Sequence, residues 1–266
     1  MTPEGTANRT PFTDASVAMW CLPSKQLSLG DSEVHVWRAA LDETLSTIAS
    51  FRGLLAVDEL AKADRFYFQS DREHFIVAHG VLRSLLGFYL NSAPRRLSFR
   101  YSSHGKPALL LEPRPDAIRF NMSHSHGVAI YAFARNREVG IDLEFIRRGV
   151  HEDQIAERFF SPREIATLRM VPAALQRFAF FLCWTRKEAY IKARGEGLSL
   201  PLNQFDVSLA PGEPAALLGT RPDPLEAGRW SLVDLSYGLP GYAAALATEG
   251  TAPSLALWQW PSSNSL

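Results

Sequence analysis

Hydrophobic and polar residues follow two different spacings along this chain. Short runs rich in Val, Ile, Phe and Trp, often alternating with polar residues, are typical of strands. Apolar positions three and four residues apart instead predict amphipathic helices. Strands are therefore expected at residues 34–37, 96–101, 118–120, 128–133, 139–145, 205–209, 230–235, 242–247 and 255–260. Helices are expected at residues 57–68, 71–90, 152–160, 162–170 and 172–194.

The order of these elements repeats along the chain, which predicts two related halves. Residues 63–67 (Ala-Asp-Arg-Phe-Tyr) also match residues 156–160 (Ala-Glu-Arg-Phe-Phe). We expect an α+β fold with a first half at 31–136, a second half at 137–266 and a ligand cleft between them. Residues 1–30 are expected to form a flexible leader because they are rich in Pro, Thr, Ser and Gly.

The composition argues against several classes of protein. The 28 basic and 28 acidic side chains balance, which argues against a general nucleic-acid binder. Cys21 and Cys183 are far apart and lack CxxC spacing, so neither a disulfide framework nor a zinc site is predicted. No apolar run is long enough to span a bilayer, and the polar N-terminus lacks the apolar core of a signal peptide. We expect a soluble, cytoplasmic protein with no nucleic-acid or membrane partner.

Three carboxylates and a lysine stand at spacings that favour a single site. Asp142 and Glu144 are two residues apart in the apolar run 139–145, so both point to one face of a strand. Two such like charges repel each other unless a cation lies beside them. Glu188 and Lys192 are four residues apart and share one face of a helix. If the three carboxylates converge, they suit a hard divalent cation that grips a phosphate.

Simpler interpretations stay open for both acidic segments. Asp142 and Glu144 could be exposed carboxylates on the solvated face of an edge strand. Glu188 and Lys192 could form an ordinary ion pair on a helix surface, worth about 0.2–0.5 kcal/mol. Such a pair, taken alone, is more often structural than catalytic.

Two polar segments in the first half add candidate ligand contacts. Residues 121–126 read Asn-Met-Ser-His-Ser-His, and their amide, hydroxyl and imidazole groups suit a phosphate or a ribose. A polar hairpin is the alternative, since a His-x-His metal site would need further His or Cys ligands. The tripeptide Gly105-Lys106-Pro107 predicts a turn from which a lysine projects.

The order of these motifs resembles a known enzyme family. Lys62, residues 105–107, residues 120–125, residues 139–144 and residues 184–192 follow one another as in the 4′-phosphopantetheinyl transferases of the Sfp type. The resemblance implies a pseudo-dimer of two α+β halves with the active site between them. It implies Mg²⁺-dependent transfer of the phosphopantetheine arm of coenzyme A to a serine of an acyl or peptidyl carrier protein. The other product is then adenosine 3′,5′-bisphosphate, and a monomer is expected.

The resemblance also implies roles for individual residues. Asp142, Glu144 and Glu188 would hold Mg²⁺, and Glu188 would accept the proton of the carrier serine. Lys192 would face the pyrophosphate as a mobile positive charge. The residues implied for the coenzyme A site are Gly105, Lys106, Pro107, Asn121, Ser123 and His124, with Lys62 and His74 near its 3′-phosphate. His74 stands where many relatives carry an arginine, so binding of that phosphate is expected to depend on pH.

The same resemblance places the coenzyme A site on the first half and the metal and carrier sites on the second. The carrier protein would dock over residues 152–177. The arginines expected to attract an acidic carrier are Arg158, Arg163, Arg169 and Arg177. Two other functions stay open: a Mg²⁺-dependent hydrolase of a pyrophosphate, and a carrier-binding protein without activity. The sequence does not identify the carrier, whether of fatty-acid, polyketide or nonribosomal-peptide biosynthesis.

Overall fold

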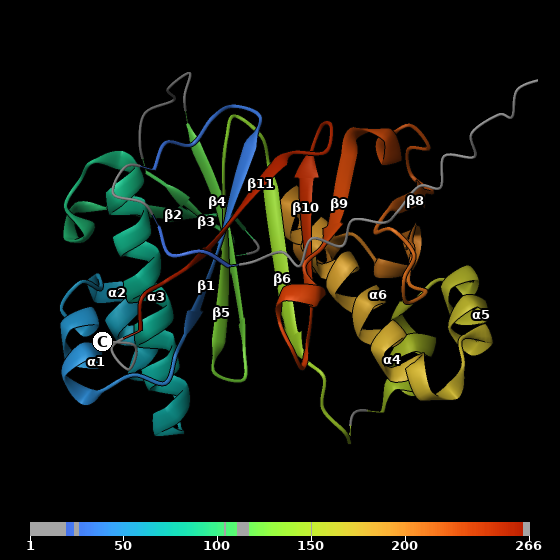
Figure 1. Cartoon of the computed structure of the whole chain (residues 1–266), viewed down its shortest axis with the longest axis horizontal. Helices are drawn as coiled ribbons and strands as arrows, with labels where there is room; N and C mark the ends of the chain where they lie inside the picture. The colour runs from blue at the N-terminus through green and yellow to red at the C-terminus, as the bar shows by residue number, and fades with distance from the viewer. Residues whose placement is uncertain (1–19, 24–26, 104, 111–116, 150, 263–266) are drawn as a thin grey trace, which may run out of the picture.

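Two β-sheets lie side by side between two sets of helices (Figure 1). The computed structural model describes residues 20–23, 27–103, 105–110, 117–149 and 151–262. The α+β class predicted from the sequence is confirmed. None of the helices within these residues is long and apolar enough to cross a membrane.

The first sheet has four strands in the order β11-β1-β5-β4 and carries the helices of the first half. Strand β1 runs parallel to β11, and the other pairs are antiparallel. Strands β2 and β3 form a separate small hairpin. The elements are β1 (Glu33–Ala40), α1 (Leu45–Arg52), α2 (Val57–Ala63), α3 (Gln69–Leu90), η1 (Pro94–Arg96), β2 (Phe99–Tyr101), β3 (Pro107–Leu109), β4 (Ile118–Ser125) and β5 (Val128–Arg135).

The second sheet has three antiparallel strands in the order β6-β10-β9. Its longest helix, α6, has 22 residues, as does α3 of the first half. Strands β7 and β8 pair apart from this sheet. The elements are β6 (Val139–Phe145), α4 (Glu152–Phe159), α5 (Pro162–Met170), α6 (Ala173–Arg194), η2 (Gly197–Ser199), η3 (Leu202–Gln204), β7 (Phe205–Val207), β8 (Leu217–Thr220), η4 (Glu226–Arg229), β9 (Trp230–Asp234), η5 (Ser236–Gly238), β10 (Tyr242–Glu249) and β11 (Ser254–Gln259).

Most expected elements are present, and the differences lie at short or weakly patterned segments. The helix expected at 57–68 ends at Ala63, and a separate helix, α1, was not predicted. Thr44 caps α1 by accepting a hydrogen bond from the Thr47 N–H at 3.3 Å. Helix α1 has only eight residues, too few for its apolar positions to establish a helical period. The expected strand 96–101 begins only at Phe99, after a 3₁₀ turn.

Strand β11 differs from the expected division of the chain. Residues 137–266 were predicted to form the second half, yet β11 joins the first sheet beside β1. The neighbouring β1 offers a free strand edge, and pairing satisfies the backbone groups of both strands. The division near residue 136 otherwise stays a prediction.

Part of the expected leader is packed against the fold. The Trp20 indole N–H donates to the Gly238 carbonyl at 2.9 Å, and Leu29 is buried in the first core. These apolar side chains are removed from water, which opposes the flexibility expected from composition. Residues 1–19 and 24–26 of that leader lie outside the described residues.

Alternate residues of the central strands enter different cores, as the two-residue period of a strand requires. In β1, Val34 and Val36 face the second sheet, whereas Trp37 packs under the helices of the first half. In β10, Leu246 lies between the sheets and Ala247 lies under α6. The result is one apolar core between the sheets and one beneath each set of helices.

Helix α6 lies unusually close to β6 because Gly140 has no side chain. A Cβ atom at Gly140 would overlap the Ala189 carbonyl oxygen and the backbone nitrogen of Ala193. Gly140, Asp142 and Glu144 occupy every second position of the strand, so all three face the helix. Because Gly140 has no side chain, α6 lies close enough to β6 to contact the Asp142 carboxylate.

We expect Gly140→Ala to destabilise the protein by about 1–3 kcal/mol, because the added methyl group must push α6 away from β6. Urea unfolding followed by circular dichroism measures this loss. Gly219→Ala is the matched control, since Gly219 lies in strand β8 and its Cβ would meet no atom within 4 Å. Equal stability of the two variants would contradict the close-approach explanation.

Candidate active site

The two carboxylates of β6 share the face that points toward α6. Asp142 is only 3% exposed and Glu144 is half-buried. Ile141 and Leu143 point the other way, into the core between the sheets. The interpretation of Asp142 and Glu144 as exposed residues of a solvated strand face is therefore wrong.

One face of α6 supplies the other half of the site. Glu188 and Lys192 are half-buried, while most of their neighbours on the helix are fully buried. The Lys192 ammonium lies 2.6 Å from Asp142 Oδ1 and 3.0 Å from the Ser123 hydroxyl. Lys192 therefore forms its ion pair with Asp142 of β6.

Strand β4 joins the site to the first sheet through three side chains at alternate positions. The Asn121 amide oxygen accepts a hydrogen bond from the Ile141 N–H at 2.8 Å. Ser123 donates to Asp142 Oδ1 at 3.0 Å, and Ser125 donates to Glu144 at 3.2 Å. The expected polar segment thus holds the edges of the two sheets together, a role that its composition did not reveal.

The three carboxylates of the site carry more negative charge than Lys192 balances. Burial, together with the charges of Asp142 and Glu144, raises the pKa of Glu188 to about 7 against the opposing effect of Lys192. Burial and Asp142 also raise the pKa of Glu144. Asp142 Oδ2 is buried and has no hydrogen-bond partner among the described residues. A cation beside these oxygens would relieve both the repulsion and the unsatisfied acceptor.

The donor types fit Mg²⁺, although the protein does not form a complete metal cage. Within the described part of the chain, no group of three His, Cys, Asp or Glu side chains is arranged to hold a metal ion. Mg²⁺ is commonly held by one or two carboxylates together with waters and substrate phosphates. Asp142, Glu144 and Glu188 could provide such oxygens, with the remaining positions filled by a ligand.

A cluster of basic side chains surrounds His124. Burial, together with the positive charges of His79, Lys192, His74 and Lys62, lowers the pKa of His124 to about 4. The expected phosphate-binding residues Lys62, His74 and His124 are therefore close enough for their charges to act on one another. His74 Nε2 also lies 2.7 Å from Asp42 Oδ1, so its charge is partly balanced.

His79 belongs to this cluster and was missed in the sequence. Its ring stacks on Phe75 at 4.0 Å, and its Nδ1 lies 3.0 Å from Glu59 Oε1. Glu59 is buried and also accepts a 2.6 Å hydrogen bond from the Arg83 guanidinium. The signal was the four-residue spacing of Phe75, His79 and Arg83, which places them along one side of α3.

Lys106 does not present a free ammonium to a ligand. Its Nζ donates to the Val139 carbonyl at 3.2 Å and the Ala193 carbonyl at 3.0 Å, and lies 3.1 Å from Glu138. Gly105 adopts φ +80°, which only glycine adopts without strain, so the predicted turn is present.

Two further charged residues of α6 are structural. Lys187 is fully buried and lies 2.8 Å from Glu164 of α5. Arg186 is buried as well and lies 2.8 Å from Asp234 at the end of β9. Both point away from the half-buried face of Glu188 and Lys192, so they fix the helix from the side opposite the candidate site.

Known proteins share this combination of motifs. Residues 138–247, which include β6 and α6, match the family described as the 4′-phosphopantetheinyl transferase superfamily. The chain is 40% identical to the 4′-phosphopantetheinyl transferase HetI of Nostoc sp. over 216 residues, which are 81% of this chain and 88% of the relative. The chain belongs to the 4′-phosphopantetheinyl transferase superfamily.

Two proteins of Bacillus subtilis extend the comparison. A 4′-phosphopantetheinyl transferase is 32% identical to this transferase over 66% of this chain and 77% of its own length. The 4′-phosphopantetheinyl transferase Sfp is 33% identical over 60% of this chain and 68% of its own length. The family predicted from the motif order is confirmed. The chain is accordingly an enzyme that transfers phosphopantetheine to carrier proteins.

We expect Lys62→Met to raise the pKa of His124 from about 4, because one of the positive charges that disfavour the protonated ring is removed. The ring signals of His124 in an NMR titration measure this change. His151, at the start of α4, serves as an internal control whose titration should be the same in both proteins. An unchanged midpoint for His124 would show that Lys62 lies outside the basic cluster.

Proposed function

We propose that this transferase moves the 4′-phosphopantetheine arm of coenzyme A onto a serine hydroxyl of an apo acyl or peptidyl carrier protein. Mg²⁺ is required, and adenosine 3′,5′-bisphosphate is released. The observation that carries the proposal is the meeting of Asp142, Glu144 and Glu188 beside the Lys192 ammonium. Excess carboxylate charge next to the lysine ammonium suits a pyrophosphate that arrives with a divalent metal.

The residues of the site match the requirements of the reaction. Mg²⁺, held by Asp142, Glu144 and Glu188 with the pyrophosphate oxygens, would supply positive charge to the phosphorus centre. The serine oxygen bonds to the phosphorus of the phosphopantetheine arm, and the bond from that phosphorus to the bridging oxygen breaks. Glu188 would accept the serine proton, directly or through a metal-bound water. Lys192 offsets negative charge on the departing nucleotide.

The basic cluster supports binding of the nucleotide end of coenzyme A. Lys62, His74 and His79 gather positive charge around His124 on the first half, next to Lys192 of the second. Because those cations depress the pKa of His124, a dianionic phosphate among them would raise it again. The 3′-phosphate of coenzyme A is such a dianion. The turn at Gly105 and Pro107 would line the adenosine.

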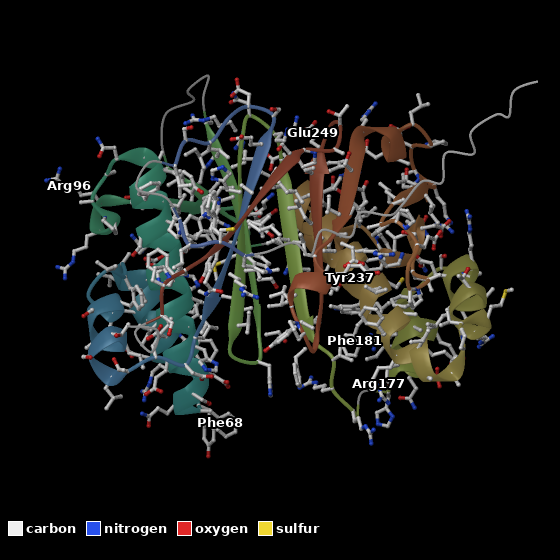
Figure 2. All side chains as sticks on the ribbon, viewed as in Figure 1. Phe68, Arg96, Arg177, Phe181, Tyr237 and Glu249 are labelled. Carbon is white, nitrogen blue, oxygen red and sulfur yellow. The ribbon has the colours of Figure 1, made fainter. Side chains whose placement is uncertain are left out.

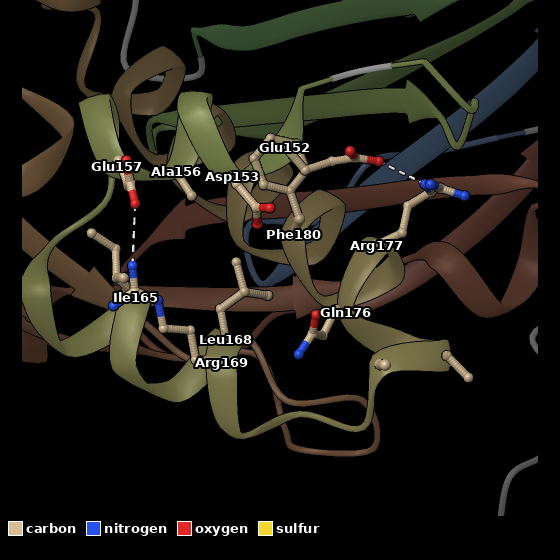
Figure 3. A pocket seen from close by; sticks show the side chains of 12 residues that line it. Glu152, Asp153, Ala156, Glu157, Ile165, Leu168, Arg169, Gln176, Arg177 and Phe180 are labelled. Atoms are coloured by element: carbon tan, nitrogen blue, oxygen red, sulfur yellow. Dashed lines mark hydrogen bonds and ion pairs between the residues drawn. The ribbon is translucent and has the colours of Figure 1, made fainter.

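A hollow on the second half supports the predicted docking of the carrier protein. It has a volume of about 590 Å³ and lies between α4, α5 and the start of α6 (Figure 3). Arg169 pairs with Glu157 at 3.2 Å, and Arg177 pairs with Glu152 at 2.6 Å. These two expected arginines are thus neutralised by their own neighbours.

The remaining two expected arginines are better placed to attract an acidic carrier. Arg158 and Arg163 are exposed, and neither forms an ion pair with another described residue. Met170, the last residue of α5, adds apolar surface because it is 85% exposed. Unbalanced positive charge around an apolar contact suits a partner that carries acidic residues around its modified serine.

We expect Asp142→Asn and Glu188→Gln each to lower kcat by about two to three orders of magnitude, because each removes a charge that acts on the reacting groups. Mass spectrometry of a panel of apo-carrier proteins, incubated with coenzyme A and Mg²⁺, measures the transfer. Glu249→Gln is the matched control, since Glu249 lies at the opposite end of β10 from the site (Figure 2).

The same assay separates transfer from hydrolysis. A transferase leaves coenzyme A intact when no carrier is present, whereas a hydrolase consumes it. Near-normal transfer by either variant at saturating Mg²⁺ would contradict the assigned roles. Loss of coenzyme A without a carrier would replace the proposed function with the hydrolase.

We expect Arg158→Glu to raise the KM for the carrier several-fold without changing the KM for coenzyme A. Raising the ionic strength should act in the same direction on the unmodified enzyme, because exposed charges are screened within about 8–10 Å. Arg96→Glu is the control, since Arg96 is exposed on the far side of the first half (Figure 2). A carrier KM that ignores both salt and charge reversal would place docking on the apolar surface around Met170 instead.

A further inference from the structure

Lys106 ties together the two elements that carry the catalytic side chains. It lies in the turn between β2 and β3, and its ammonium reaches across to the second half. It donates to the carbonyl of Val139, the first residue of β6, and to the carbonyl of Ala193, near the end of α6. It also lies 3.1 Å from the Glu138 carboxylate. An ammonium has three donors, so these three acceptors saturate it.

The position of these bonds is important because it coincides with the closest approach of helix and strand. Val139 precedes Gly140, whose missing side chain lets α6 lie against β6 at Ala193. Ala193 follows Lys192, whose ammonium pairs with Asp142. Lys106 therefore bonds to both the strand and the helix, at one end of the contact between them. That contact sets the distance between Lys192 and Asp142.

The interaction has the properties of a helix cap supplied by another part of the chain. The carbonyl groups of the last helical turn have no partner within the helix, and positive charge is favourable there. The Lys106 side chain is only 17% exposed, and burial lowers its pKa, against the raising effect of Glu138. A Cβ atom at Gly195 would lie 3.6 Å from Lys106 Cδ, so the chain beyond the helix leaves room for the lysine stem.

We propose that Lys106 is a positioning residue: it fixes α6 against β6 and thereby holds Lys192 in contact with Asp142. The effect of this role on kcat rests on the proposed function. Its effect on the position of α6 rests on the geometry alone. It differs from the role expected by resemblance, in which Lys106 lines the coenzyme A site. A charge contact from its ammonium to coenzyme A would need a proton that is already donated to the protein.

The two roles of Lys106 predict different kinetics for Lys106→Met. If the lysine positions α6, kcat should fall about ten- to a hundred-fold, because a small misplacement of catalytic groups has effects of this order. The Kd for coenzyme A, measured by calorimetry, should change less than about three-fold. If the lysine instead binds coenzyme A, the Kd should rise while kcat at saturation is kept. That second result would overturn the proposal.

Two further variants separate positioning from general support of the fold. Lys106→Arg keeps the charge and several donors, so it should recover a substantial part of the lost kcat. Arg119→Met is the matched control, because Arg119 also pairs with Glu138, at 3.3 Å, but is not bonded to the Val139 or Ala193 carbonyl in the described structure. Equal loss of kcat in the arginine and methionine variants at position 106, or in the control, would overturn the proposal.

A crystal structure of Lys106→Met tests the inference independently of activity. The Lys192 Nζ to Asp142 Oδ1 distance, 2.6 Å in the native chain, should lengthen beyond hydrogen-bonding range. If that contact is kept unchanged, the positioning role is wrong whatever the kinetics. If the contact is lost but the native enzyme modifies no apo-carrier, the proposed function fails while the positioning role stands.

Discussion

The close approach of α6 to β6 at Gly140 is the constraint on which the site depends. Only a residue without a side chain lets the helix backbone lie against the strand at Ala189 and Ala193. The rest of the geometry follows from the periods of the two elements. Asp142 is two residues after Gly140 on the strand, so it faces the helix; Glu188 and Lys192 are four residues apart on the helix, so both face the strand. Buried Lys187 and Arg186 hold the other side of α6 through Glu164 and Asp234. The candidate catalytic groups are thus placed by regular elements, whose positions are better defined than those of loops.

Without a ligand, the protein has two neighbouring regions of unbalanced charge, one negative and one positive. On the second half, the charge of Asp142 raises the pKa of Glu144 and of Glu188, and cations on the first half lower the pKa of His124. Lys192 lies between them and contacts both Ser123 and Asp142. A ligand with a metal-bound pyrophosphate at one end of its nucleotide and a phosphate at the other would neutralise both regions at once. Such mutual neutralisation favours a ligand that carries both groups over one that carries either alone.

The sequence predicted the class of fold, the family and the residues that meet at the site, because these depend on local periodicity and motif order. The shared face of Asp142 and Glu144 needed only the two-residue period of a strand. The return of β11 to β1 could not be predicted, since strand pairing across more than two hundred residues leaves no local signal. The roles of Lys106 and Asn121 were also missed: both side chains bond to backbone groups of distant strands, and composition does not identify such partners. His79 had a helical spacing that pointed to α3, but only the structure brings it near His124.

The parallel pairing of β11 with β1 means that the chain crosses between the two sheets twice. It passes once from β5 to β6 and returns from β10 to β11. A protein of two domains joined by a single linker can open like a hinge, with the linker as its axis. Here two separate crossings, together with the hydrogen bonds between β4 and β6, restrain that rotation. We therefore expect the site groups of the two halves to keep a fixed separation, so that selection among ligands depends on shape and charge rather than on closure.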